Sequence, residues 1–270
     1  MTKLVWLLAF ASLAYGQDPA EILRKSVQRD GDNYARRKDY TYQEMQETRV
    51  LDKNGAATRV SSETHDILIL SGRPYERLTA KDGKPLSEKE ERREQEKIDK
   101  ESARRIKDTA KERAELEKDR RDRREFAQQI PVAYNVQLLG EEPVSGHTAW
   151  KLSVDPKPGY KAPNKEAEVL KKVKGTVWVD QETYQLVKFD IDVIETFSWG
   201  FFVLRIPPGA KITYEQNRVN DEVWLPREIH VRADPKIALL KTFHIAMDIA
   251  YQDYRKFQSD SQIVSSSAAP

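Results

Sequence analysis

The sequence contains no cysteine. Disulfide bonds, thiol nucleophiles and cysteine-ligated metal sites are therefore excluded. A chain of 270 residues is long enough to bury a core of its own, so it does not depend on disulfide bonds for stability.

An excess of charge of one sign is also missing. The 46 basic and 44 acidic residues nearly cancel and leave a net charge of +2. A nucleic-acid-binding domain usually carries a basic excess, so we expect no nucleic-acid partner.

A membrane span needs about 20 apolar residues. Residues 197–204 are too few, and residues 237–250 are interrupted by Lys241, His244 and Asp248, so we expect no span in the mature chain.

Signatures of catalysis are absent as well. The sequence has no G-x-S-x-G, P-loop or dinucleotide-binding motif. Its four histidines are not spaced like metal ligands, and each falls in an expected strand. Asp190 and Asp192 share a strand face and could hold a cation, but Lys188 on the same face favours a solvated surface. A pair of carboxylates for glycoside hydrolysis is not excluded, because their separation in space decides it. The sequence predicts no catalytic residue, no metal ligand and no cofactor.

The first residues have the pattern of a secretory signal peptide. Lys3 precedes the apolar residues 4–15, and small residues at positions 14 and 16 suit cleavage before Gln17. We therefore expect residues 1–16 to be removed and the chain to reach the periplasm. An uncleaved anchor or a buried N-terminal helix is the alternative. No cysteine follows that could carry a diacyl anchor.

Hydrophobic periodicity predicts an α+β fold. Residues 18–38 have a helical pattern, with Asp18 before Pro19 as the N-cap and Gly31 as a possible break. Alternating or β-branched runs, bounded by turn residues, predict strands. The expected strands are 40–52, 56–70, 74–80, 135–139, 147–154, 175–180, 184–195, 211–219, 222–233 and 242–254. Residues 165–172 suit a short helix. We expect one large curved antiparallel sheet with helices over one face, and a disordered tail at 258–270.

Residues 87–125 are strongly charged, with 15 basic and 14 acidic residues among 39. Ser87 and Glu90 form a capping box, acid-to-base pairs recur at i, i+4, and Pro131 is the expected end of the helix. With few apolar residues, this pattern indicates a solvated helical insertion spanning about 87–130, a partly disordered segment, or an arm that docks a protein.

Residues 197–204 (FSWGFFVL) are apolar on both alternating faces. A fully buried strand would explain this pattern. The segment could also line an apolar cavity or cover its opening. Directly after it in the sequence, Pro207-Pro208-Gly209 predicts a turn. On that second interpretation, the candidates for contact with an apolar ligand are Trp199, Phe201, Phe202 and Leu204, together with Trp178.

The second half of the chain resembles a known family. Residues 146–152 (GHTAWKL) and 175–188 (GTVWVDQETYQLVK), with the export signal, the N-terminal helix and the first hairpin, resemble the LolA/LolB-like lipoprotein-sorting proteins and their RseB-like relatives. The resemblance implies an incomplete β-barrel closed by helices around a cavity for acyl chains, here as one domain over residues 17–257. The charged segment is an insertion that the compact carriers lack, and no cavity arginine can be assigned.

Three functions remain open. The first is a periplasmic carrier or sensor that holds a lipid or lipoprotein acyl chain, because burial of each CH₂ contributes about 0.8 kcal/mol without any catalytic group. The second is a non-enzymatic envelope module that docks a partner protein through the charged helix. An envelope hydrolase is the third, and it is disfavoured because no nucleophile or metal motif is present.

Overall fold

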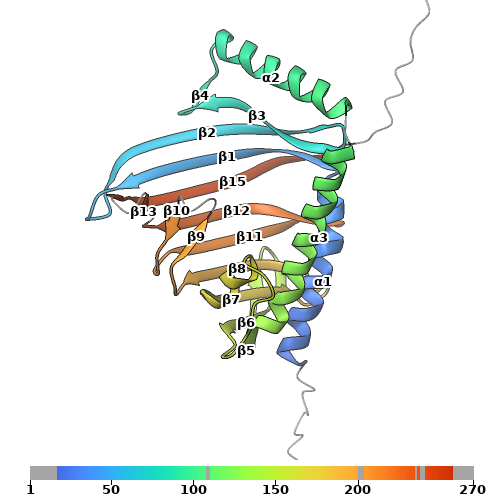
Figure 1. Ribbon diagram of the computed structural model, residues 1–270, viewed down its shortest axis with the longest axis vertical. Coiled ribbons are helices and arrows are strands. Elements are labelled where there is room, and N and C mark those ends of the chain that lie inside the picture. The colour runs from blue at the N-terminus through green and yellow to red at the C-terminus, as the bar shows by residue number, and fades with distance from the viewer. Residues whose placement is uncertain (1–16, 108–109, 200–203, 235, 238–240, 258–270) are drawn as a thin grey trace, which may run out of the picture.

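The computed structural model describes residues 17–107, 110–199, 204–234, 236–237 and 241–257. The main element is an antiparallel sheet of 11 strands in the order β4-β3-β2-β1-β15-β12-β11-β8-β7-β6-β5. The edge strands β4 and β5 lie at opposite ends of this order, so the sheet is open (Figure 1). The α+β fold and the large antiparallel sheet expected from the sequence are confirmed.

The strands of the main sheet agree closely with the alternating segments of the sequence. Along the chain they are β1 (Tyr40–Leu51), β2 (Ala57–Leu70), β3 (Arg73–Lys81), β4 (Lys84–Pro85), β5 (Tyr134–Val144), β6 (His147–Pro156), β7 (Val173–Asp180), β8 (Leu186–Val193), β11 (Lys211–Val219), β12 (Val223–Ala233) and β15 (His244–Lys256). Turn residues join them: Gly55, Asn220 and Asp221 adopt the positive φ angles that tight hairpins require.

The first helix, α1 (Pro19–Arg37), begins where the sequence indicates. The carboxylate of Asp18 accepts a hydrogen bond from the backbone N–H of Ala20 at 3.1 Å, and Pro19 occupies the first turn. The helix continues through Gly31 without a break, because its apolar face is held by the buried residues Ile22 and Leu23.

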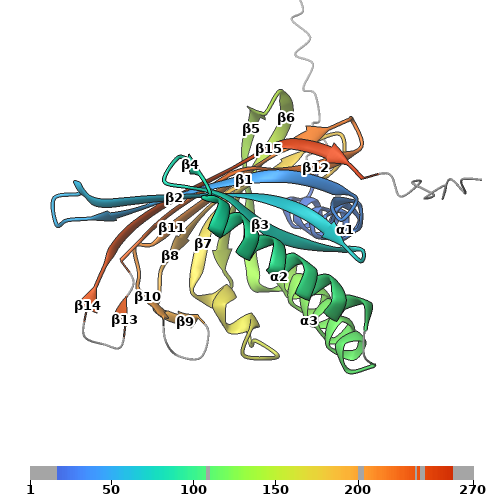
Figure 2. The same cartoon turned by 90° about the horizontal axis from the view of Figure 1, so that it is seen from above.

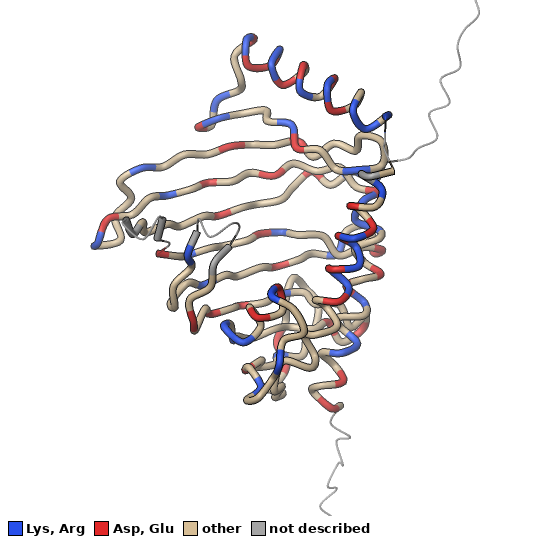
Figure 3. Tube along the Cα trace, in the orientation of Figure 1, with Lys and Arg blue, Asp and Glu red and all other residues tan. Residues whose placement is uncertain are grey.

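The charged segment forms two helices rather than one, α2 (Glu88–Ile106) and α3 (Ala110–Ala133). The capping box is present: the Glu90 carboxylate accepts hydrogen bonds from the backbone N–H of Ser87 at 3.0 Å and from its hydroxyl at 2.6 Å. The expected end at Pro131 is wrong, since α3 continues to Ala133. Charged residues crowd along both helices (Figure 3), but the last turns of α3 pack Phe126 and Ile130 against the core.

The helices occupy two positions on the sheet. Helices α1 and α3 lie side by side and cross the strands at one end of their length. Helix α2 runs along the edge of the sheet beside β3 (Figures 1 and 2). Beneath α1 and α3, with the 3₁₀ turn η1 (Ala167–Lys171), lies the largest hydrophobic cluster. It includes Leu152 and Val154 of β6 and Val177 and Val179 of β7. This side of the sheet is called the helix side below.

A second, four-stranded sheet includes the described ends of the segment 197–204. These ends lie in two strands, β9 (Phe197–Trp199) and β10 (Leu204–Ile206), which pair as an antiparallel hairpin. Strand β10 also pairs with β13 (Lys236–Ile237), which pairs with β14 (Lys241–Thr242). The small sheet therefore ties the β8–β11 connection to the β12–β15 connection. It lies at the end of the long strands away from α1 and α3, displaced toward the helix side (Figures 1 and 2).

Candidate functional site

Pairing across the sheet brings apolar side chains into rows on the helix side. Directly opposed residues in antiparallel strands point to the same face. One row runs from Val177 through Phe189, Tyr214 and Ile229 to Ile249. The parallel row runs from Gly175 through Ile191, Ile212 and Val231 to Met247. We call the part formed by the following eight residues the apolar face: Phe189, Ile191, Ile212, Tyr214, Ile229, Val231, Met247 and Ile249.

The rows become polar when they reach β1 and β2. Ile249 is opposite Gln46, which is opposite Glu63, and Met247 is opposite Thr48, which is opposite Ser61. A third pair on this side, Glu44 and His65, extends the polar border toward the helices. The helix side thus carries an apolar surface over β8, β11, β12 and β15 with a polar margin along β1 and β2.

The apolar face is only partly covered. All eight of its residues are half-buried, whereas Leu152 and Val179 under the helices are completely buried. Helix α1 contacts β5, β7, β8 and β12, and α2 contacts β3. An apolar surface flanked by helices at one end and by the small sheet at the other, yet only half-buried, is a surface that can accept an apolar ligand.

Aromatic rings border the apolar face on the side of the helices. Phe189 stacks on Tyr214 at 5.0 Å between ring centroids, and Tyr42 contacts the rings of Tyr251 and Tyr254 at 5.8 and 5.2 Å. The guanidinium of Arg37, at the end of α1, donates to the Tyr214 hydroxyl at 2.7 Å. Burial raises the pKa of Tyr42 to about 12, so its hydroxyl stays protonated at neutral pH.

The pKa of Glu44, in the polar margin, is raised. Burial is the main cause and repulsion by Glu76 adds to it, while His65 and Tyr251 act in the opposite direction. A half-buried carboxylate thus stands directly beside the apolar face.

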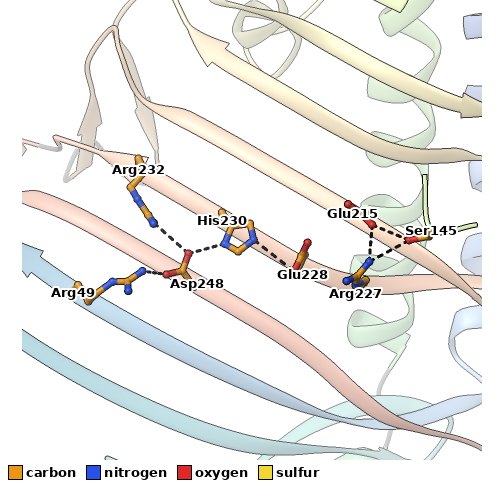
Figure 4. A network of polar contacts seen from close by, with 8 residues as sticks. All are labelled: Arg49, Ser145, Glu215, Arg227, Glu228, His230, Arg232 and Asp248. Atoms are coloured by element: carbon orange, nitrogen blue, oxygen red, sulfur yellow. Dashed lines mark hydrogen bonds and ion pairs between the residues drawn. The ribbon is translucent and has the colours of Figure 1, made fainter. Parts of the chain in front are cut away.

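The opposite side of the sheet carries a network of ion pairs and hydrogen bonds. Asp248 is bonded to Arg49, to Nδ1 of His230 at 2.6 Å and to Arg232 at 3.2 Å (Figure 4). Nearby, the Glu215 carboxylate accepts hydrogen bonds from the Ser145 hydroxyl at 2.7 Å and from Arg227 at 2.9 Å. Because Ser145 is bonded to Glu215 and His230 to Asp248, this network contains no serine–histidine pair.

Of the five sequence-predicted ligand residues, the structure describes the side chain of Trp178. Trp178 is fixed between Val177 and Val179, both in the helix-side core, so alternation directs it to the other side of the sheet. There it packs with Val187 and Trp224, and Lys151 and Lys188 lie over its ring at 5.2 and 4.8 Å. Trp178 is therefore not part of the apolar face.

The remaining candidates belong to the small sheet. The backbones of Trp199 and Leu204 are directly opposed across β9 and β10. Phe201 and Phe202 lie outside the described residues. Sequence inspection missed the apolar face itself, although its members were visible as the apolar halves of alternating strands. Only the pairing order shows that these halves join.

Two hollows elsewhere are poorer candidates. One of about 490 Å³ between α2 and β3 is lined mainly by charged side chains, including Glu94 and Lys97, and suits an apolar ligand badly. Another of about 300 Å³ lies at the irregular pairing of β1 with β15, where Tyr42 of the aromatic border lines it together with polar residues such as Thr41 and Arg255. Over the described residues, no group of three or more histidine and acidic side chains is placed to hold a metal ion. No helix in that part of the chain has the length and apolar character of a membrane span.

The sequence matches no protein-family model and no curated protein. Several solved structures are similar over most of the chain. A putative outer membrane lipoprotein-sorting protein domain from Vibrio parahaemolyticus is 11% identical, with a TM-score of 0.33 over 88% of this chain and 94% of that one. A LolA superfamily protein from Nitrosomonas europaea is 12% identical, with a TM-score of 0.30 over 89% and 93%.

A third similar structure is a chain of the MucA/MucB complex of Pseudomonas aeruginosa. It is 12% identical, with a TM-score of 0.26 over 90% of this chain and 100% of that one. At these identities and TM-scores, a ligand or a partner has to be inferred from the residues of this chain.

Proposed function

We propose that this protein is a carrier or sensor of the bacterial cell envelope that binds a lipid or lipoprotein acyl chain on the apolar face. The observation that carries the proposal is the continuity of the face across β8, β11, β12 and β15 while its residues remain only half-buried. An acyl chain laid along these rows would complete the burial of aliphatic side chains at about 25 cal/mol per Å² of apolar surface.

The proposal includes the segment around residues 197–204. The described parts of this hairpin and its partners β13 and β14 lie toward the helix side, at the end away from α1. Phe197 and Ile206, whose backbones are opposed in this hairpin, are half-buried apolar residues. On this proposal the hairpin covers the far end of a bound chain and places Trp199, Phe201, Phe202 and Leu204 near it.

A fluorescent fatty-acyl probe tests the binding directly. Purified wild-type protein should bind the probe saturably. Ile249→Glu places a charge on the apolar face and should weaken binding at least tenfold, which corresponds to about 1.4 kcal/mol. Ala250→Glu places the same charge one residue along β15, on the opposite side of the sheet, and should leave affinity within about twofold. Circular dichroism of both variants verifies folding.

The hairpin is tested separately with Phe201→Asp, which should lower probe affinity about tenfold. If it lowers stability by the 3–5 kcal/mol typical of losing a core phenylalanine, the segment belongs to the core instead. If wild-type protein shows no saturable binding, the carrier proposal fails. The second proposal then replaces it: a module that docks an envelope partner through the exposed charges of α2, such as Glu88 and Arg92.

A further inference from the structure

Tyrosine rings gather at the end of the apolar face nearest α1. The ring of Tyr42 on β1 contacts the rings of Tyr251 and Tyr254 on β15, and Tyr214 lies on β11 beside Arg37. A cluster of four phenol groups brings four hydroxyls to the border of an apolar surface. Since a half-buried hydroxyl is costly without a hydrogen bond, the partner of each hydroxyl is informative.

Two of the four hydroxyls have a hydrogen-bond partner within the protein. The Tyr214 hydroxyl accepts from Arg37 at 2.7 Å. Tyr254 donates to the carbonyl oxygen of Pro226. Tyr251 is directly opposite Glu44 in the pairing of β1 with β15. For the Tyr42 hydroxyl, the described residues provide no hydrogen-bond partner. Tyr42 is also the central ring, because it contacts both Tyr251 and Tyr254.

We propose that the Tyr42 hydroxyl donates a hydrogen bond to the ester or amide carbonyl at the polar end of the bound acyl chain, and so selects esterified or amidated acyl groups over free fatty acids. This inference rests on the proposed function and deepens it. The carbonyl lies at the tyrosine cluster, and the chain runs away from α1 over Ile229, Ile249 and Met247 toward the small sheet.

The surrounding charges favour a neutral carbonyl over a carboxylate. Glu44 is two residues from Tyr42 on the same side of β1 and would repel an anionic head group. Arg37, the nearby cation, already donates to the Tyr214 hydroxyl and to the side-chain carbonyl of Gln216 at 2.9 Å. The Tyr42 hydroxyl itself remains a donor at neutral pH, because its pKa is raised to about 12.

The test compares two competitors that differ only in the carbonyl. A monoacylglycerol and the matched monoalkylglycerol ether, with equal chain lengths, displace the fluorescent acyl probe from wild-type protein. One hydrogen bond should make the ester bind about tenfold more tightly than the ether. Tyr42→Phe should bind the two equally and keep its affinity for the ether. Tyr254→Phe is the matched control, since that hydroxyl is already bonded to Pro226, and it should keep the preference.

The outcomes separate this inference from the function beneath it. Equal affinity of wild-type protein for ester and ether overturns the role of Tyr42 but leaves acyl binding intact. A preference retained in Tyr42→Phe overturns it too. Tighter binding of the free fatty acid than of the ester overturns the choice of a neutral head group. Absence of any probe binding overturns the proposed function and this inference together.

Discussion

The side-chain amide of Asn33 forms two hydrogen bonds with the backbone of Trp224. Its Nδ2 donates to the Trp224 carbonyl at 2.7 Å, and its Oδ1 accepts from the Trp224 N–H at 2.9 Å. Asn33 is buried, and it lies on α1 while Trp224 lies on β12. One side chain therefore substitutes for a neighbouring strand and fixes the helix to the sheet.

Loss of this amide should be expensive. Asn33→Ala leaves the Trp224 N–H without its partner and leaves the Trp224 carbonyl with only the longer bond from Arg37 Nε at 3.4 Å, so we expect a loss of about 2–4 kcal/mol of unfolding free energy. Thermal denaturation should show a Tm lower by roughly 5–15 °C. Asn135→Ala, on an exposed position of β5, is the control and should change Tm little. A similar Tm in both variants would contradict the importance of the contact.

Two glycines should respond oppositely to the same substitution. A Cβ on Gly175 would lie 2.1 Å from the backbone oxygen of Asp190, so Gly175→Ala must push β7 and β8 apart and should cost about 1–3 kcal/mol or more. A Cβ on Gly31 meets nothing within 4 Å in the middle of α1. Gly31→Ala should stabilise the protein by about 0.5–1 kcal/mol. Urea denaturation of the pair measures both signs, and a stabilised Gly175→Ala protein would refute the packing argument.

Arg105 should decide whether α2 stays on the sheet. Its guanidinium, 9% exposed, donates to the carbonyls of Leu70, Arg73 and Pro74 and pairs with Glu101 at 2.6 Å. Charged hydrogen bonds contribute about 1.5–3 kcal/mol, so Arg105→Ala should accelerate amide exchange in α2 at least tenfold. Arg104→Ala removes a 52% exposed arginine that also pairs with Glu101 and should leave the exchange rate nearly unchanged. Equal exchange in both variants would show that α2 is held by other contacts.

Glu44 should make stability depend on pH. Since folding raises its pKa above 4.5, the protonated form is favoured in the folded state. The contribution of this group is therefore fully present below 4.5 and is lost as the pH rises through the folded-state pKa. Glu44→Gln, neutral at every pH, should raise Tm at pH 7, and the gain should vanish below about pH 4. Glu63→Gln, on a half-exposed neighbour in the polar margin, is the control. A gain that persists at low pH would contradict the burial argument.

The sequence was sufficient to predict where the strands lie along the chain, but not how they pair in the sheet. Alternation along the expected strand 184–195 predicts Val187, Phe189 and Ile191 on one face and Lys188 and Asp190 on the other. The sheet confirms this for Phe189 and Ile191. A register shift between β7 and β8 instead packs Val187 with Trp178, because one extra residue in a strand reverses every side chain before it.

Contacts between residues far apart in the sequence could not be predicted from local sequence patterns. The described ends of the doubly apolar segment, β9 and β10, pair with each other, and β10 also pairs with β13, more than thirty residues later in the sequence. The sequence alone gives no reason to single out Tyr42, because tyrosine is common in strands. Its significance comes from Tyr251 and Tyr254, which only the pairing of the first strand with the last brings beside it.

That pairing of β1 with β15 has a consequence for how the protein is made. The two strands lie near opposite ends of the chain, yet they are neighbours in the middle of the sheet. Contacts so distant in sequence must wait until almost the whole polypeptide has emerged, and such contacts slow folding. Until β15 has been synthesised, β1 lacks one of its two neighbours. The surface formed by β12 and β15 therefore becomes complete only when β15 docks, so the proposed acyl ligand would meet its full binding surface only after β15 has paired.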